Sequence, residues 1–374
     1  MARIELCNIT KRFKKITAIN DIKLEVKDKE FLVLFGPAGA GKTTILKTIA
    51  GLEYPDQGQI KFDGEVINHI EPTHRNVSMV FENYALYPHI NVYDNIASPL
   101  RSPLYKKDEE YIKKKVNAIA TVMKIDNLME RLPSQLSNGQ RQRVALGRCL
   151  VREPKVFLMD EPLAHLDAKL RHLMRAELKE MQSQFNTTTI YVTHDYMEAL
   201  SLGDRIAIVI QGRFEQIGTG DDIFYRPANE LVAKLMGEPE INIFQTELVS
   251  DNGNFMLKML CQERLFALPD DVAKILSAKK VNKFDLGIRG NDIKFYFEKP
   301  DASFLTGTIY TIEPIGNKSI LTVDVNGQFL RMVAPSDLRA EMDSTIYIKL
   351  NLEHALFFNC DDQKFVTRHV SNII

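Results

Sequence analysis

A glycine-rich loop between an apolar run and a helical pattern constrains this chain most. The apolar run covers residues 31–35, and the loop follows directly at residues 36–44. After the loop, apolar residues recur at helical spacing until Gly51, which predicts a buried strand, a loop and a helix in that order. This order is what a phosphate-binding P-loop requires, because the glycines let backbone N–H groups converge on an anion at a helix N-terminus.

The loop predicts a binding site for a nucleoside triphosphate. Lys42 can reach the outer phosphates, and the Thr43 hydroxyl can ligate Mg²⁺. A glycine-rich turn with a chance lysine is the alternative interpretation, and the surrounding strand and helix disfavour it. The candidate nucleotide-binding residues of the loop are Gly36, Pro37, Ala38, Gly39, Ala40, Gly41, Lys42, Thr43 and Thr44.

An aromatic residue stands inside a basic segment upstream of the loop. Phe13 lies between Lys11-Arg12 and Lys14-Lys15. A solvated basic turn is the ordinary interpretation, but an exposed aromatic ring is also able to stack on a nucleotide base. Phe13 is therefore a further candidate nucleotide-binding residue.

Polar side chains follow two later strands of the predicted sheet. The run at residues 156–161 closes on Asp160 and Glu161, and the run at residues 189–193 ends at His194. Buried parallel strands deliver their C-terminal residues to the ligand crevice of an α/β sheet. Asp160 can bind Mg²⁺ directly or through water, and Glu161 can polarise an attacking water. A lone histidine is usually structural, but the position of His194 at a strand end favours a catalytic role.

Composition limits the remaining classes of function. The 374 residues suggest two domains, and the formal net charge of -1 gives no reason to expect a nucleic-acid partner. Four cysteines far apart argue against a zinc site and suit a reducing cytoplasm. The N-terminus lacks the apolar core of a signal peptide. No apolar run approaches the ~20 residues that span a bilayer, so we expect a protein that is not itself embedded in the membrane.

Two further stretches carry distinct signals. The loop at residues 82–89 is rich in aromatics, and we expect Tyr84, Leu86 and Tyr87 to be exposed for contact with another protein, unless the loop folds onto its own core. Beyond about Gly237, short strands recur between turns such as those at residues 252–253, 316–317 and 326–327. This pattern predicts an all-β module of two barrel-like lobes.

Taken together, the motifs resemble the ATP-binding-cassette (ABC) ATPases. Residues 36–43 match the Walker A motif of that family, Leu136 to Gln140 its signature LSGGQ, and residues 156–161 its Walker B motif. Residues 164–167 resemble its D-loop, which ends at Asp167, and His194 its switch histidine. The stretches at residues 83–89, 225–229, 287–292 and 313–316 resemble the subgroup of maltose-type carbohydrate importers.

The resemblance implies a fold class and its division into domains. Residues 1–237 would form an α/β P-loop NTPase core, with an antiparallel β subdomain and a helical subdomain at about residues 84–155. Residues 238–374 would form a C-terminal all-β regulatory domain of the OB type.

The resemblance also implies a dimer that holds two ATP molecules between its subunits. Glu161 would be the general base, His194 would position the γ-phosphate and the attacking water, and Thr43, Glu82 and Asp160 would meet Mg²⁺. Signature residues would act on the ATP of the opposite subunit: Ser137, Asn138, Gly139 and Gln140. Two transmembrane permease subunits would bind the ATPases at the cytoplasmic face of the membrane, and an extracytoplasmic solute-binding protein would take part indirectly.

Departures from the family pattern motivate a further hypothesis. Glu82 replaces the family's glutamine, Asn138 replaces a glycine, and Ala164-His165 replaces the commoner Ser-Asn pair. Residues 289–291 lack the usual Pro-Glu after arginine. Because Glu82 adds negative charge near the phosphates, we expect ATP binding to survive this change and the rate or coupling of hydrolysis to differ. Because asparagine tolerates left-handed conformations, Asn138 is expected to preserve a glycine-like backbone. One hypothesis is a non-identical ATPase partner whose sites complement this chain.

Two other functions stay open at this point. The chain could serve an importer of another solute, such as a polyamine, a metal ion or sulfate. It could also be a poorly hydrolysing regulatory subunit that acts through its β domain. The sequence does not identify the solute, because such an ATPase subunit never needs to touch it.

Overall fold

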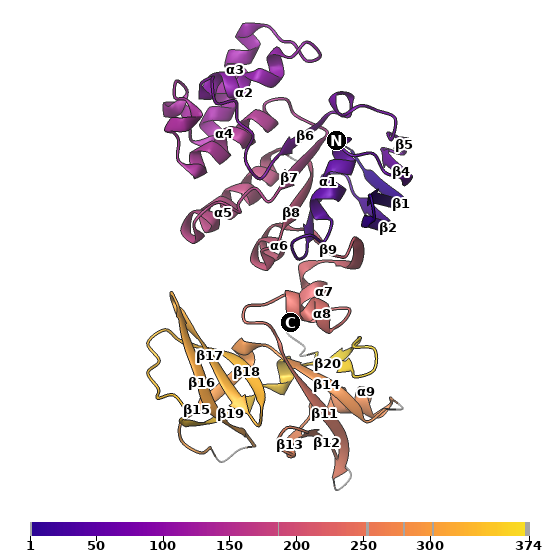
Figure 1. Cartoon of the computed structure of the whole chain (residues 1–374), viewed down its shortest axis with the longest axis vertical. Helices are drawn as coiled ribbons and strands as arrows, with labels where there is room; N and C mark the ends of the chain where they lie inside the picture. Colours follow the sequence, from indigo (N-terminus) through magenta and orange to yellow (C-terminus); the bar gives the residue numbers. More distant parts are fainter. Residues whose placement is uncertain (1, 186, 252–253, 280, 301–302, 371–374) are drawn as a thin grey trace. The chain divides into compact units, whose positions relative to one another are not determined.

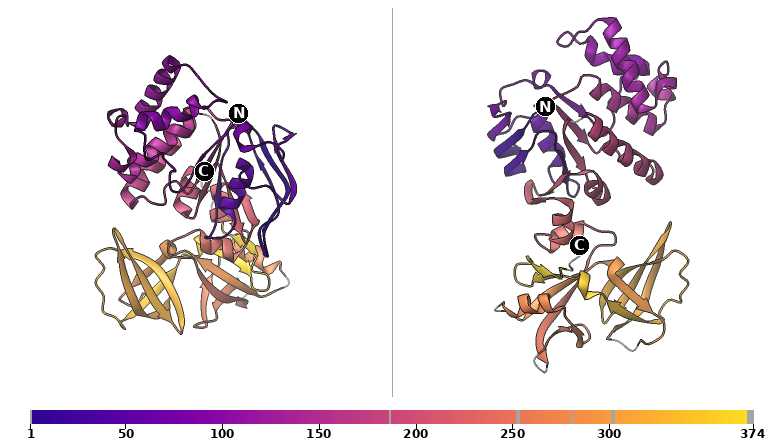
Figure 2. Two further views of the ribbon diagram at one scale, coloured as in Figure 1. Left: turned by 45° about the horizontal axis from the view of Figure 1, so that its top comes forward. Right: turned by 180° about the vertical axis from the view of Figure 1, so that it is seen from behind.

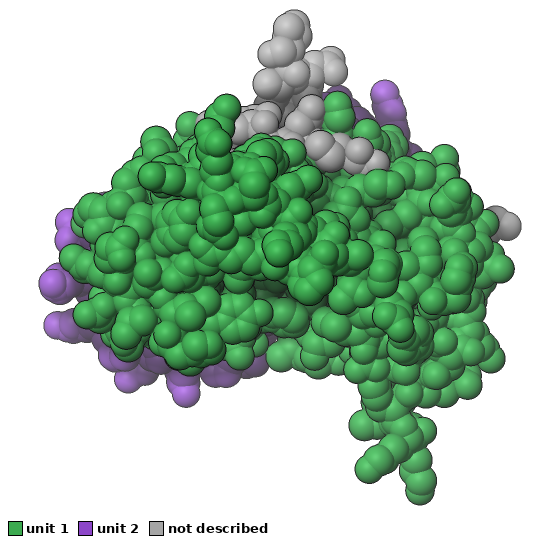
Figure 3. Space-filling view, turned by 90° about the horizontal axis from the view of Figure 1, so that it is seen from above, with its two compact units in different colours: residues 1–220 green, residues 221–374 purple. Residues whose placement is uncertain are grey.

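The computed structural model describes residues 2–185, 187–251, 254–279, 281–300 and 303–370. Its internal contacts divide the chain into two compact units, residues 1–220 and 221–374, which Figure 3 colours separately. The sequence placed the boundary near Gly237, whereas the contacts group the short helices α7 (Gly220–Tyr225) and α8 (Glu230–Leu235) with the second unit. The exact domain boundary stays a prediction.

A six-stranded sheet forms the centre of the first unit (Figure 1). Its strand order is β10-β9-β3-β8-β7-β6, and the pairs β9–β3, β3–β8, β8–β7 and β7–β6 are parallel. The predicted apolar runs form buried strands that carry their C-terminal residues to one edge. The strands are β3 (Phe31–Phe35), β6 (Val77–Val80), β7 (Val156–Asp160), β8 (Thr188–Thr193), β9 (Arg205–Ile210) and β10 (Arg213–Gly218).

A second, antiparallel sheet of the first unit has the order β2-β1-β4-β5. Alternating residues of its strands are buried against the central core. The strands are β1 (Ile4–Phe13), β2 (Ile16–Val26), β4 (Gln57–Phe62) and β5 (Glu65–Val66).

Helices surround the central sheet and form a separate cluster beside it. Helix α1 (Lys42–Ala50) ends at Gly51, which adopts the left-handed conformation with φ 84°. Helices α5 (Ala168–Phe185) and α6 (Tyr196–Leu202) lie along the sheet, whereas α2 (Val92–Arg101), α3 (Glu109–Met123) and α4 (Asn138–Leu150) lie together (Figures 1 and 2). Among the described residues, no helix combines the length and the apolar character needed to cross a bilayer.

The aromatic loop at residues 82–89 agrees only in part with the expectation of three exposed side chains. Tyr87 is exposed as expected, and Leu86 is half-buried. Tyr84, however, is only 5% exposed, so the expectation that it is exposed was wrong. The loop therefore combines a buried anchor with an exposed ring.

The second unit contains two antiparallel sheets around one apolar core. The first sheet has the order β13-β12-β11-β14-β20-β21, and the second has the order β15-β19-β16-β17-β18. Asn242 connects the two, because its side-chain amide donates to the Ile288 and Arg331 carbonyls at 3.2 and 2.8 Å. Hairpin turns lie at the predicted residues 316–317 and 326–327, while the turn predicted at 252–253 lies outside the described residues.

The sequence did not anticipate helix α9 (Asp270–Ser277) in this unit. The strands of the first sheet are β11 (Asn242–Asp251), β12 (Asn254–Met259), β13 (Arg264–Ala267), β14 (Lys283–Ile288), β20 (Leu356–Asn359) and β21 (Phe365–Arg368). Those of the second sheet are β15 (Ile293–Tyr296), β16 (Leu305–Ile315), β17 (Lys318–Val325), β18 (Gln328–Pro335) and β19 (Thr345–Leu350).

Candidate functional site

The loop at residues 36–44 joins β3 to α1 and depends on its glycines. Gly39 has φ 76°, and Gly41 has φ 102°. A Cβ atom on Gly41 would lie 2.4 Å from the Ala18 carbonyl oxygen of β2, so only glycine fits there. Pro37, Ala38 and Gly39 are exposed at the top of the loop, and the Ala40 carbonyl accepts from Gly212 N–H at 2.9 Å.

Lys42 points back into the loop. Its ammonium group donates to the Gly36 and Pro37 carbonyls at 2.8 and 3.0 Å and lies 3.7 Å from Glu161 Oε1. The residue is only 4% exposed, and burial lowers the pKa of Lys42, while the Glu161 and Asp160 carboxylates act in the opposite direction. A buried cation at a helix N-terminus is suited to bind phosphate.

Thr43 and Asp160 meet at the start of α1. The Thr43 hydroxyl donates to Asp160 Oδ1 at 2.9 Å. Burial raises the pKa of Asp160, with the nearby Glu161 and Glu82 acting in the same direction and the Thr43 hydrogen bond opposing them. The two side chains thus offer hard oxygen ligands at the place where the sequence predicted Mg²⁺.

The metal ligands are fewer than a preformed site would need. Within the described part of the chain, no group of three or more His, Cys, Asp or Glu side chains is arranged to hold a metal ion. Mg²⁺ usually binds through one or two protein oxygens together with substrate phosphates and water. Thr43 and Asp160 fit that requirement, and Glu82 pairs with a different residue.

Glu161 and His194 are brought together as expected. His194 Nδ1 lies 2.8 Å from Glu161 Oε2. Glu161 has φ 45°, and its N–H donates to the Val192 carbonyl of β8 at 3.0 Å. This contact with the neighbouring strand holds the Glu161 backbone in the left-handed region.

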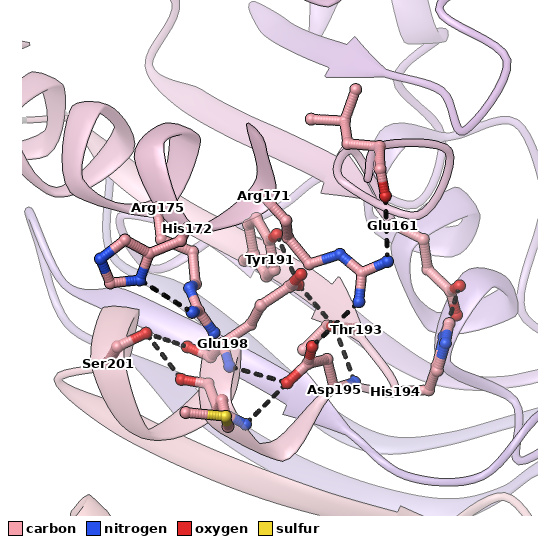
Figure 4. A network of polar contacts seen from close by, with 12 residues as sticks. Glu161, Arg171, His172, Arg175, Tyr191, Thr193, His194, Asp195, Glu198 and Ser201 are labelled. Atoms are coloured by element: carbon pink, nitrogen blue, oxygen red, sulfur yellow. Dashed lines mark hydrogen bonds and ion pairs between the residues drawn. The ribbon is translucent and has the colours of Figure 1, made fainter. Parts of the chain in front are cut away.

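Beside His194, a polar network holds the end of β8 in place (Figure 4). Glu198 Oε2 accepts from the Tyr191 and Thr193 hydroxyls at 2.8 and 2.7 Å. Asp195 caps α6 and also accepts from Arg171, which in turn donates to the Leu166 carbonyl at 3.2 Å. The network connects the His194 segment to residues 164–167, and the sequence analysis missed its members Arg171 and Glu198. The spacing of Glu198, four residues after His194 on a short helix, was a signal that could have indicated it.

Glu82 faces a residue that the sequence analysis singled out separately. His165 Nε2 lies 3.5 Å from Glu82 Oε1. Both side chains are more than half exposed. Two departures from the family pattern, far apart in the sequence, are thus neighbours in the fold.

Ser137 begins α4 in a reciprocal cap. Its hydroxyl accepts from Gln140 N–H at 3.4 Å, while Gln140 Oε1 accepts from Ser137 N–H at 3.0 Å. Asn138 is the first residue of the helix and does not have a positive φ, so its backbone does not use the left-handed conformation that asparagine tolerates. Gly139 is buried, and a Cβ atom there would lie 2.6 Å from Leu170. Ser137 and Asn138 are exposed.

Two other predicted residues lie apart from this centre. Asp167 is exposed and caps α5, where its carboxylate accepts from Leu170 N–H at 2.9 Å. Phe13 is 41% exposed, and the Lys11 ammonium lies 5.2 Å from its ring. Phe13 pairs with Ile16 in β2, two residues before the Ala18 that touches Gly41.

The site and the sheet define a P-loop NTPase of the cassette type, and comparisons with known proteins agree. The sequence model of the ABC transporter family matches residues 19–164. The trehalose/maltose import ATP-binding protein of Thermococcus litoralis is 42% identical over 342 residues, which cover 87% of this chain and 89% of that protein. The multiple sugar-binding transport ATP-binding protein of Streptococcus mutans is 38% identical over a stretch that covers 97% of this chain and 99% of that protein.

Solved structures show the same fold for the first part of the chain. A dimeric ATP-binding cassette bound to ADP and Pi superimposes with a TM-score of 0.53 at 28% identity, covering 58% of this chain and 98% of that one. A nucleotide-free cassette superimposes with a TM-score of 0.53 at 27% identity, and the match covers 59% of this chain and 93% of that chain. This chain belongs to the ABC transporter family, as one of its ATP-binding proteins. The expected likeness to the ATPase subunits of carbohydrate importers is confirmed.

The Glu198 network predicts a difference between two substitutions. Glu198→Ala leaves two buried hydroxyls without an acceptor, and we expect a loss of about 2 kcal/mol in the free energy of unfolding. Glu198→Gln keeps an acceptor oxygen and removes a buried charge, so we expect little loss at neutral pH. Thermal and denaturant unfolding of the full chain measures both.

The raised pKa of Glu198 sets the direction of the pH dependence. Burial is its main cause, so the folded state holds the proton more tightly than the unfolded state. This contribution to stability is present at low pH and is lost as the pH rises through the folded pKa. The free energy of unfolding of the Glu198→Gln variant should lack this loss as the pH rises. If the variant and the wild-type protein show the same pH dependence, Glu198 is not its source.

The contact between Glu82 and His165 predicts non-additive kinetics. Glu82→Gln and His165→Ala, separately and together, should show an interaction of about 0.5–1 kcal/mol, because each substitution removes the same contact. The measurements are the ATPase rate and the affinity for nucleotide with and without Mg²⁺. Strict additivity in both measurements would rule out a functional pair.

Proposed function

We propose that this chain is the ATP-hydrolysing subunit of an ABC importer that drives uptake of a carbohydrate or a related polar solute through partner permeases. The observation that supports it most is the convergence of Lys42, Thr43, Asp160, Glu161 and His194 at one edge of the central sheet. Two relatives are named for trehalose/maltose import and trehalose import, and a third for multiple sugar-binding transport; these names support uptake as the direction and a carbohydrate as the solute class.

Each residue of the convergence has one task in this proposal. The N–H groups of residues 36–44 and the Lys42 ammonium bind the phosphates of ATP, and Phe13 stacks on the adenine. Glu161 accepts a proton from the attacking water, and His194 orients that water and the γ-phosphate. Their contact at 2.8 Å keeps the base and the orienting group in one arrangement.

Thr43 and Asp160 would hold Mg²⁺, with Glu82 nearby as a third candidate ligand. The metal supplies positive charge that offsets the negative charge of the phosphates. Thr43 and Asp160 already share a hydrogen bond at 2.9 Å, so their oxygens lie in the same place before any metal binds.

A second ATPase subunit completes the site in this proposal. Ser137 and Asn138 are exposed at the N-terminus of α4, where a helix end attracts an anion. With Gly139 and Gln140 they would close on the ATP of the opposite subunit, and Asp167 would lie at the same seam. The dimeric cassette bound to ADP and Pi is a precedent for such an arrangement.

The aromatic loop would receive the permease subunits. A hollow beside the loop is lined by apolar residues, among them Tyr87, Pro99 and Leu104, and by polar residues, among them Arg148 and Arg152. Tyr87 and Leu104 are about half exposed. A hollow of this mixed character suits a protein segment that brings both apolar and polar side chains. The protein would then be peripheral at the cytoplasmic face of the membrane, and the extracytoplasmic solute-binding protein would act on it only through the permeases. The second unit would be an OB-type regulatory domain.

Transport itself tests the proposal. The full chain, reconstituted in vesicles with its permeases and binding protein, should hydrolyse ATP faster in the presence of the transported sugar. Polyamines, metal ions and sulfate are the comparison solutes. Stimulation by one of those alone would overturn the carbohydrate assignment and keep the ATPase assignment.

Removal of the general base should separate binding from hydrolysis. We expect Glu161→Gln to lower the hydrolysis rate at least about 100-fold, because the neutral amide does not accept the proton. Binding of ATP should remain, since Lys42 and Thr43 are untouched. Steady-state ATPase and nucleotide affinity measure the two effects, and Lys42→Ala, which should lose binding, is the control.

Light scattering of the same variant tests the dimer. With ATP and Mg²⁺, the purified Glu161→Gln protein should change from monomer to dimer, because ATP joins the subunits and is not consumed. Hydrolysis by the wild-type homodimer would count against a non-identical partner. A monomer under all conditions would support that partner.

A further inference from the structure

The loop at residues 82–89 has a backbone that its own sequence does not favour. Tyr84 and Ala85 are consecutive non-glycine residues with φ 62° and 45°. Left-handed conformations of such residues cost on the order of 1–2 kcal/mol each and persist only where neighbours hold them. Within the segment, Tyr84 N–H donates to the Phe81 carbonyl at 2.9 Å and Ala85 N–H donates to the Asn83 carbonyl at 2.8 Å. The carbonyls of residues 84 and 85 are bound from outside the loop.

Arg148 of α4 makes the contacts that do this. Its Nη2 donates to the Tyr84 carbonyl at 2.9 Å, and its Nη1 donates to the Ala85 carbonyl at 2.7 Å. The guanidinium carbon also lies 5.4 Å from the centre of the Tyr87 ring. A planar fork of donors matches two successive carbonyls in a way that a lysine ammonium does not.

The other end of the loop is held from α2. Asn95 is fully buried, accepts from Tyr87 N–H at 2.9 Å, and donates to the Tyr87 and Ile90 carbonyls at 3.1 and 3.0 Å. The backbone of residues 84–87 is thus hydrogen-bonded to side chains of both α4 and α2. A shift of α4 relative to α2 must change this short segment.

Helix α4 carries Ser137 at one end and Arg148 near the other. Arg148 follows Ser137 by eleven positions, which is about 16 Å along the helix. The same helix therefore connects the exposed cap residues to the loop, and Glu82 lies only two residues before Tyr84. Among the described residues, Arg148 is the one side chain of α4 that donates a hydrogen bond to residues 82–89.

We propose that Arg148 is a positioning residue that transmits the state of the nucleotide site, through α4, to the loop that receives the permease. This inference rests on the proposed function. When ATP draws the N-terminal end of α4 toward a partner subunit, Arg148 moves the Tyr84 and Ala85 carbonyls with it. The loop, its exposed Tyr87 and the adjacent Glu82 change position together.

Hydrogen exchange on the purified full chain tests the link without any permease. The wild-type protein with a non-hydrolysable ATP analogue and Mg²⁺ should change its amide protection both at the start of α4 and in residues 82–91. Arg148→Lys should keep the first change and lose the second. The matched control is Arg143→Lys, on the same helix, because Arg143 contacts Met123 and Glu177 instead of the loop.

Reconstituted transporter supplies the second measurement. Arg148→Lys should lower solute transported per ATP hydrolysed by about tenfold, with assembly of the complex retained, whereas Arg143→Lys should not. The inference is overturned if Arg148→Lys and Arg148→Ala both behave like the wild-type protein in two respects. These are the solute transported per ATP hydrolysed and the change in amide protection of residues 82–91 on binding the ATP analogue. A wild-type protein that shows the exchange response but no stimulation by any solute would overturn the proposed function and leave the Arg148 link standing.

Discussion

The buried ammonium of Lys42 is the interaction on which the rest of the first unit depends. A cation removed from water is costly unless carbonyls or carboxylates surround it, and here two loop carbonyls and Glu161 do so. These acceptors come from β3 and from the end of β7, so both strands must end at the same edge. The parallel pairing of β3 with β8 and of β8 with β7 provides that alignment.

Side chains of the surrounding helices hold the segments that follow the strands at this edge of the central sheet. Glu198 and Asp195 hold the segment that carries His194, and Arg171 joins Asp195 to the Leu166 carbonyl. Arg148 does the same for the loop after β6. In each case a side chain from a helix fixes a backbone segment just beyond a strand end. A small displacement of α4 or α5 therefore moves these segments and the site residues that they carry.

The sequence predicted the features that depend on local pattern. The loop, helix α1, the buried strands and the cap at Ser137 follow from runs of residues and their spacing. Tyr84 was placed wrongly, because its burial and its left-handed backbone depend on Arg148, 64 residues away. The contact between Glu82 and His165 was missed for the same reason: strand order, which no local pattern fixes, brings their segments together. Helix α9 was missed because turn signals dominate its surroundings.

These contacts also reduce the number of departures from the family pattern that support a non-identical partner. The departures from the family pattern at residues 82 and 165 contact each other within a single chain, so neither needs a different partner subunit to find a neighbour. Arg289 is likewise engaged inside the second unit, where it donates to the Phe224 carbonyl at 2.9 Å and stacks on the Phe224 ring. Asn138 has an ordinary helical backbone and differs from glycine only in its exposed side chain. The case for a different partner therefore depends on whether that one amide fits against the nucleotide of an identical subunit.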